Sequence, residues 1–153
     1  MKWREPGMTR RRENGKTGGN TYMPTKIRYR WELDLYKLSV DAAMQIFEVS
    51  KKFPREEMYS LTDQIRRSSR SVSGQISEAW RRRKYEAVFV NKLNEAEGEA
   101  AETQTWLEYC CVRCGYLPAK QGRELHKLYN RALGKLVTMG NNPQQWILPR
   151  RSK

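Results

Sequence analysis

Apolar residues recur every three or four positions through four segments of this chain, a spacing typical of amphipathic α-helices. The predicted helices cover residues 32–52, 55–83, 86–114 and 119–139. Gly115 and Pro118 supply a stop signal after the third of them. No stretch shows the period-two alternation of a strand. Four long helices with short connections predict an all-α fold, an antiparallel up-down four-helix bundle.

The same spacing predicts which face of each helix is buried. The expected inward residues are, helix by helix, Leu33, Tyr36, Val40, Ala43 and Phe47; Met58, Leu61, Ile65, Ser69, Val72, Ile76, Ala79 and Trp80; Phe89, Leu93, Ala96, Ala100, Thr103, Leu107, Cys110 and Cys114; and Leu125, Leu128, Ala132, Leu136 and Met139. Several of them are small, so we expect neighbouring helices to approach closely.

Basic residues outnumber acidic ones by 30 to 17, which gives the 153-residue chain a formal net charge of +13. The excess is concentrated at the ends. Residues 1–30 carry a net +7 and residues 143–153 a net +3, which leaves +3 for residues 31–142. We therefore divide the chain into a basic arm (1–30), a bundle (31–142) and a basic C-terminal tail (143–153). Such a charge favours anionic partners, above all RNA or DNA.

The second predicted helix buries one face and carries cations on the other. On a helical wheel, the positions opposite the apolar seam are Arg66, Arg67, Arg70, Arg81 and Lys84. Three interpretations stay open for this stripe: contact with nucleic acid, plain solvation, or ion pairs with a neighbouring subunit or with the third helix. That helix offers Glu95, Glu99 and Glu102 on its outward side.

Aromatic residues alternate with cations in the arm and again in WILPR near the C-terminus. Cations bind phosphates while rings stack on bases, so this mixture is typical of segments that bind single strands or loops. The alternative is that Trp3, Tyr22, Tyr29 and Trp31 pack onto the bundle or a neighbouring subunit. The predicted nucleic-acid-binding residues are Arg10, Arg11, Arg12, Lys26, Arg28, Arg30, Arg66, Arg67, Arg70, Arg81, Lys84, Arg150 and Arg151.

We do not expect an enzyme or a bound cofactor. The only histidine, His126, follows an inward position, and no Gly-rich phosphate loop is present. Cys110, Cys111 and Cys114 could join it as zinc ligands, but their helical spacing favours buried apolar packing. No apolar run suits a membrane span or a secretory leader, and three cysteines favour a reducing cytoplasm.

The segment FPREEMYSLTDQIRRSSRSVSGQISEAWRRR, together with LEYCCVRCGYLP, resembles the bacterial four-helix-bundle proteins encoded in intervening sequences of 23S rRNA genes. The matching positions are Phe53, Pro54, Glu57, Leu61, Gln64, Ile65, Arg66, Arg67, Ser71, Ile76, Glu78, Gly115 and Tyr116. The resemblance covers about residues 31–140. It departs at residues 75–79, where QISEA stands in place of the family's NIAEG, and at residues 102–104, where ETQ replaces ELE.

The resemblance implies a bundle that forms a homo-oligomer, in some members a homopentamer with a central channel. It also implies a relationship to the accessory proteins of diversity-generating retroelements, which bind nucleic acid beside a reverse transcriptase. We therefore expect a non-enzymatic, oligomeric nucleic-acid-binding bundle, either a reverse-transcriptase accessory subunit or an rRNA-associated protein. The alternative is a protein-interaction scaffold with no nucleic-acid role.

Overall fold

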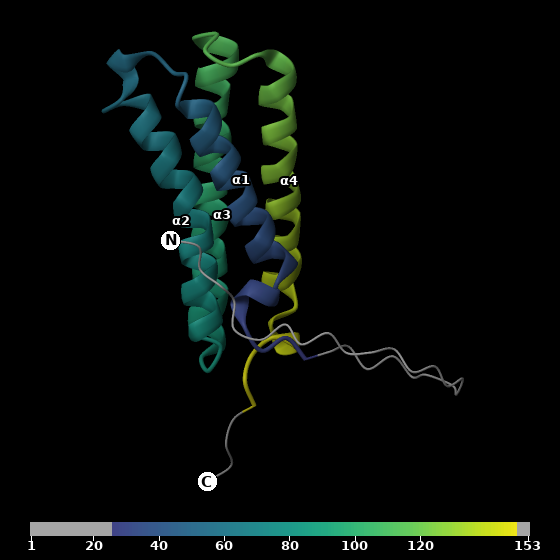
Figure 1. The fold of residues 1–153 in the computed structure, drawn as a ribbon. Coiled ribbons are helices and arrows are strands. Elements are labelled where there is room, and N and C mark those ends of the chain that lie inside the picture. The colour runs from purple at the N-terminus through teal and green to yellow at the C-terminus, as the bar shows by residue number, and fades with distance from the viewer. Residues whose placement is uncertain (1–25, 150–153) are drawn as a thin grey trace, which may run out of the picture.

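The computed structural model describes residues 26–149, in which four long helices pack side by side (Figure 1). The helices are α1 (Asp34–Ser50), α2 (Leu61–Arg81), α3 (Glu86–Glu108) and α4 (Ala119–Asn141). Shorter turns flank them: the 3-10 turns η1 (Arg30–Glu32), η2 (Arg55–Glu57) and η4 (Pro143–Gln145), and the π-helical turn η3 (Tyr109–Arg113). Residues 26–149 contain no strand, so the predicted all-α four-helix bundle is confirmed.

Each helix contacts two others: α2 and α4 both lie against α1 and against α3. In Figure 1 the α1–α2 and α3–α4 connections lie at one end of the bundle. The α2–α3 turn lies at the other end, near η1 and η4. Segments from both ends of the described chain are therefore gathered beside a single turn.

No helix within residues 26–149 has the length and apolar character that crossing a membrane requires.

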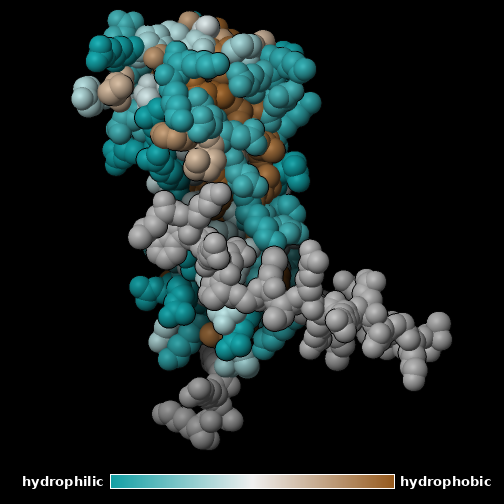
Figure 2. All heavy atoms as spheres, viewed as in Figure 1, coloured by the Kyte–Doolittle hydropathy of each residue, from teal (hydrophilic) through white to brown (hydrophobic). Residues whose placement is uncertain are grey.

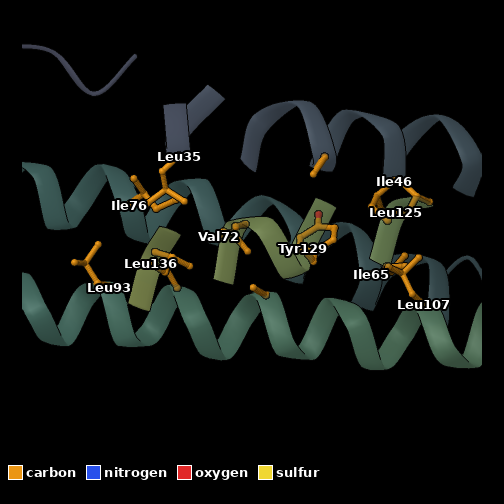
Figure 3. Packing of buried hydrophobic residues seen from close by; sticks show 14 of the residues in the cluster. Leu35, Ile46, Ile65, Val72, Ile76, Leu93, Leu107, Leu125, Tyr129 and Leu136 are labelled. Atoms are coloured by element: carbon orange, nitrogen blue, oxygen red, sulfur yellow. The ribbon is translucent and has the colours of Figure 1, made fainter. Parts of the chain in front are cut away.

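The core is built in layers to which every helix contributes one side chain (Figure 3). One layer holds Leu35, Ile76, Leu93 and Leu136, and another holds Ile46, Ile65, Leu107 and Leu125. Between the two layers lies Tyr129, whose ring is fully buried. Burial raises the pKa of its hydroxyl, which stays protonated. Small residues surround this level, and Thr103 donates a hydrogen bond of 2.8 Å to the hydroxyl of Ser68.

The buried face of α1 differs from the predicted one. Its buried residues are Leu35, Ser39, Ala42, Ala43, Ile46 and Ser50. The predicted inward residues Tyr36, Val40 and Phe47 are only half-buried. Phe47 does not need the core, because cations cover its ring: the guanidinium carbons of Arg66 and Arg70 lie 5.0 and 5.6 Å from its centroid. On the face of the bundle seen in Figure 2, a strip of hydrophobic residues runs between hydrophilic surfaces, and smaller hydrophobic spots lie apart from it.

Three further predictions of inward residues were wrong: Leu128 on α4 is only half-buried, and Met58 and Cys114, both at helix ends, are exposed. Met58 is exposed because α2 begins only at Leu61, after Glu57 has accepted hydrogen bonds from the hydroxyls of Ser60 and Tyr116. Cys114 is exposed because the chain widens into η3, where its N–H bonds to the carbonyl of Tyr109 five residues back. The wider turn rotates Cys114 away from the α3 seam.

The end of α3 approaches the start of α4 most closely at Gly122. A Cβ at this position would lie 2.6 Å from the Sγ of Cys111 and 3.0 Å from its Cβ. Both distances are shorter than ordinary van der Waals contact. The absence of a side chain at Gly122 therefore sets the spacing between α3 and α4 at this end.

We expect Gly122→Ala to lower the free energy of unfolding by about 1–3 kcal/mol, since the new methyl group overpacks the α3–α4 contact. Urea denaturation followed by circular dichroism measures the change. Gly134→Ala is the matched control on the same helix, because a Cβ there meets nothing within 4 Å. The control should be neutral or more stable by up to about 1 kcal/mol. Equal losses in the two variants would contradict the close approach.

Candidate nucleic-acid interface

The predicted phosphate-binding residues separate into two groups in the structure, apart from five that lie outside the described residues. Those five are Arg10, Arg11, Arg12, Arg150 and Arg151. Of the rest, Arg66, Arg67 and Arg70 lie on the first half of α2, where α2 runs beside α1. The others lie where η1, the α2–α3 turn and the C-terminal segment meet. The sequence wheel had joined all of the α2 cations into one stripe.

The cations on the first half of α2 are largely engaged within the bundle. Arg66 donates a hydrogen bond of 2.7 Å from Nε to the hydroxyl of Ser50. Arg66 and Arg70 share the ring of Phe47. Arg67 lies 3.9 Å from the carboxylate of Asp63 one turn earlier on the same helix. Exposed pairs of this kind contribute little stability, but they lower the positive charge available to a ligand.

Pairing between α2 and α3 uses a lysine and not the arginine stripe. Lys92 lies 2.9 Å from Glu78 of α2 and 2.9 Å from Glu95 of its own helix. Hydrogen bonding to Lys92 lowers the pKa of Glu78. Within residues 26–149 no arginine of α2 lies within 4.0 Å of a carboxylate on α3. Glu99 instead has a raised pKa, chiefly because it is partly buried.

Seven cations lie on the segments that meet at the opposite end of α2, and we call this group the basic end. Its members are Lys26, Arg28, Arg30, Arg81, Arg82, Arg83 and Lys84. None of the seven lies within 4.0 Å of a carboxylate in the described part of the chain. Arg82 and Arg83 are not among the predicted binding residues, although the run of four cations after Trp80 is a signal in the sequence.

Trp80 joins the three segments that form the basic end. It is buried, and its indole N–H donates a hydrogen bond of 3.3 Å to the main-chain carbonyl of Arg28. The guanidinium carbon of Arg83 lies 3.5 Å from the centroid of its ring. The ring of Trp146 meets it edge-on, with centroids 6.3 Å apart. The N–H of Leu148 then donates to the carbonyl of Arg83 at 3.0 Å.

The carboxylate of η1, that of Glu32, is hydrogen-bonded to the main chain. Glu32 accepts hydrogen bonds of 2.7 and 2.9 Å from the backbone N–H groups of Arg28 and Tyr29. These two bonds lower the pKa of Glu32. Burial, and then the charge of Arg81, lower the pKa of Arg83. An arginine nevertheless stays charged in proteins, so the basic end keeps its full positive charge.

Aromatic side chains are exposed among these cations. Tyr29 and Trp31 stack on each other beside Arg28 and Arg30. Tyr85 is also exposed, and the ammonium group of Lys84 lies 5.5 Å from its ring centroid. Tyr29 and Trp31 therefore keep part of their surface exposed, and whether they bind a base or pack onto a neighbouring subunit stays a prediction.

A groove of about 1660 Å³ begins next to the basic end and runs between α3, α4 and the C-terminal segment. Its apolar lining comes mainly from Tyr85, Val90, Val137, Ile147 and Leu148. Glu86 and Glu97 add acidic groups to the same surface. Tyr85, Val137 and Leu148 are exposed in it, whereas Val90 and Ile147 are half-buried against the core, so part of the apolar lining is open to solvent.

The residues weighed as zinc ligands have different environments. Cys110 is buried, and burial raises the pKa of its thiol to about 12. Cys114 is exposed. His126 is exposed on α4, with Nδ1 3.4 Å from the side-chain nitrogen of Asn130. Among the described residues, no three His, Cys, Asp or Glu side chains are grouped as a metal site would need.

Comparison with known proteins identifies a family and a fold. The profile of the 23S rRNA-intervening sequence proteins matches residues 31–138. A crystal structure from Bacteroides thetaiotaomicron, described as a protein of unknown function from the S23 ribosomal protein family, is similar with a TM-score of 0.64. The two chains share 28% identity over 71% of this chain and 96% of the other. No curated protein matches the chain.

We expect Trp80→Ala to lower the free energy of unfolding by about 3–5 kcal/mol, because it removes a buried indole from the junction of three segments. Trp80→Phe keeps much of the packing but leaves the carbonyl of Arg28 without its donor, at a cost of about 1–3 kcal/mol. Urea denaturation measures both. Trp106→Ala, at a half-buried indole on α3, is the control and should cost less than Trp80→Ala. A larger loss for Trp106→Ala than for Trp80→Ala would contradict the conclusion that Trp80 joins the three segments of the basic end.

Proposed function

The chain belongs to the family of 23S rRNA-intervening sequence proteins, and from that premise we propose that it is a non-enzymatic bundle that binds RNA or DNA. The observation that supports the proposal is the basic end. Seven cations from two distant parts of the chain lie together there without a carboxylate partner in the described residues. We propose the phosphate backbone as the ligand, because it repeats negative charges along a surface of this size.

The chemistry of the seven side chains fits such a ligand. Arginine presents a planar fork of N–H donors that matches phosphate oxygens, and five of the seven are arginines. Arg81, Arg82 and Lys84 are exposed at the α2–α3 turn, where a backbone can reach them. The non-enzymatic part of the proposal rests on the sequence, which pairs no nucleophile with a base. We place this activity in the cytoplasm, as the cysteine content favours.

Self-association is the second part of the proposal. Val137 and Leu148 in the groove are both more than two-fifths exposed, as is Tyr85, and apolar surface of this kind is typical of interaction sites. A second copy of the chain is the occupant we propose. Its free cations would complement Glu86 and Glu97 in the groove. The homopentamer and the reverse-transcriptase partner stay predictions from the family resemblance.

Removing charge from the basic end should weaken nucleic-acid binding and flatten its dependence on salt. We compare the triple variant Arg81→Gln, Arg82→Gln, Lys84→Gln with wild type by fluorescence anisotropy, using a labelled structured RNA and a duplex DNA. The slope of log K against log salt is negative, and each phosphate that the variant no longer neutralises makes it less steep by about 0.7–0.9. Three such phosphates reduce its magnitude by about 2–3.

The matched control removes three exposed cations from the first turns of α4, at the other end of the bundle: Lys120→Gln, Arg123→Gln, Lys127→Gln. Both triple variants have the same net charge, so only the place of the charges differs. Equal losses of affinity would show that net charge and not the basic end controls binding. No binding by wild type at about 50 mM salt would leave the interaction scaffold as the function.

A charge in the groove should disrupt self-association. We expect wild type to sediment as an oligomer at micromolar concentration and Val137→Glu to shift it toward the 18.1 kDa monomer, because the carboxylate would be buried against a second copy. Val112→Glu changes a more exposed valine on η3, at the far end of α3, and serves as control. A wild-type chain that is monomeric at all concentrations would refute this part of the proposal.

A further inference from the structure

Tyr29 and Trp31 form a stacked aromatic pair at the surface of the basic end. Their ring centroids lie 4.6 Å apart with an angle of 5° between the planes. The exposed fractions of the two residues are 41% and 44%. The exposed parts of these two rings are apolar surface in contact with water. A ligand that covered this surface would gain free energy from its burial.

The 3-10 turn η1 fixes the pair in place. The N–H of Tyr29 donates to the carboxylate of Glu32, and the N–H of Glu32 donates back to the carbonyl of Tyr29 at 3.0 Å. The preceding carbonyl, that of Arg28, accepts the indole N–H of Trp80. Main-chain contacts at both ends therefore preorganise the two rings, and a ligand does not have to order them.

Cations extend the stack on both sides. The guanidinium carbon of Arg28 lies 5.4 Å from the ring centroid of Tyr29. That of Arg30 lies 5.5 Å from the ring of Trp31 and also 5.5 Å from the ring of Tyr36. Arg28 is exposed, so its guanidinium can leave the Tyr29 ring, whereas Arg30 is half-buried between two rings.

We propose that this pair is a stacking platform for an unpaired base, so that the preferred ligand of the basic end is a single strand or a loop of RNA or DNA. The inference rests on the proposed nucleic-acid binding and adds a ligand class to it. A base takes the place of Arg28 over the Tyr29 ring, and the guanidinium turns to the phosphate of that nucleotide. In a duplex both faces of each base are covered, so the platform stays empty and only phosphate contacts remain.

The test compares three labelled ligands with the full-length protein: an adenine-rich strand of about 12 nucleotides, the same strand with abasic sites in place of its central bases, and its duplex. The abasic strand keeps every phosphate and removes only the rings. We expect wild type to bind the intact strand about tenfold or more tighter than the abasic strand, with the same salt slope for both.

The double variant Tyr29→Ala, Trp31→Ala should bind the intact and abasic strands equally, while its affinity for the duplex is unchanged. The single variant Trp31→Phe keeps an aromatic ring at each position and should retain most of the preference for the intact strand over the abasic strand. Tyr59→Ala is the control: Tyr59 is 93% exposed and lies in the connection between α1 and α2, at the other end of the bundle. Circular dichroism melting checks that each variant is folded.

The outcomes separate this inference from the function on which it rests. Equal binding of intact and abasic strands by wild type overturns the platform and leaves phosphate binding standing, and it does so even if no variant folds. A preference that survives the folded double variant also overturns the platform, because the bases then stack elsewhere. Failure of wild type to bind any of the three ligands at low salt overturns both.

Discussion

A buried indole N–H is the constraint on which the basic end depends. Once Trp80 is taken out of water, its N–H needs an acceptor, and the acceptor it finds is the carbonyl of Arg28, 52 residues away in the sequence. The same ring supports the guanidinium of Arg83 and the edge of Trp146. The α2 helix is held by the core, so these contacts fix where the segments that precede α1 and follow α4 lie. Cations far apart in the chain thereby become neighbours.

Seven like charges in one place oppose folding, and the fold answers that repulsion without carboxylates. Cation–π contacts offset part of the repulsion: Arg83 lies over the ring of Trp80 and Lys84 lies near the ring of Tyr85. Each such contact contributes about 0.5–2 kcal/mol. Hydrogen bonds to main-chain carbonyls also stabilise the cations, since Arg83 Nε donates to the carbonyl of Trp80 at 2.8 Å. Neither kind of partner neutralises the cation. Of the cations on the first half of α2, Arg67 differs, because a carboxylate lies near it, whereas Arg66 and Arg70 also have only neutral partners.

The sequence predicted the helices well because their seams depend on local period, which needs no knowledge of neighbours. It failed where a tertiary contact or an irregular turn decided the outcome. Phe47 was assigned to the core, but cations from α2 cover it at the surface. Cys114 was assigned to the seam, but one π-helical turn rotated it outward. The stripe on α2 was read as one surface because a wheel shows direction but not which helix end lies beside η1. Long-range contacts of Trp80, with the carbonyl of Arg28 and the ring of Trp146, separate the two groups.

The two proposed surfaces share residues, and this links them energetically. Lys84 belongs to the basic end and also lines the groove. Two other groove residues lie next to basic-end cations: Tyr85 follows Lys84, and the N–H of Leu148 bonds to the carbonyl of Arg83. A second copy seated in the groove would lie next to unneutralised cations and would bring its own. A bound polyanion removes that repulsion, so nucleic acid and self-association should strengthen each other by the same factor. Several basic ends on one strand would then act together, and weak single contacts would add up to firm attachment. Under the two proposals, the chain would therefore assemble more readily on a nucleic acid than in its absence.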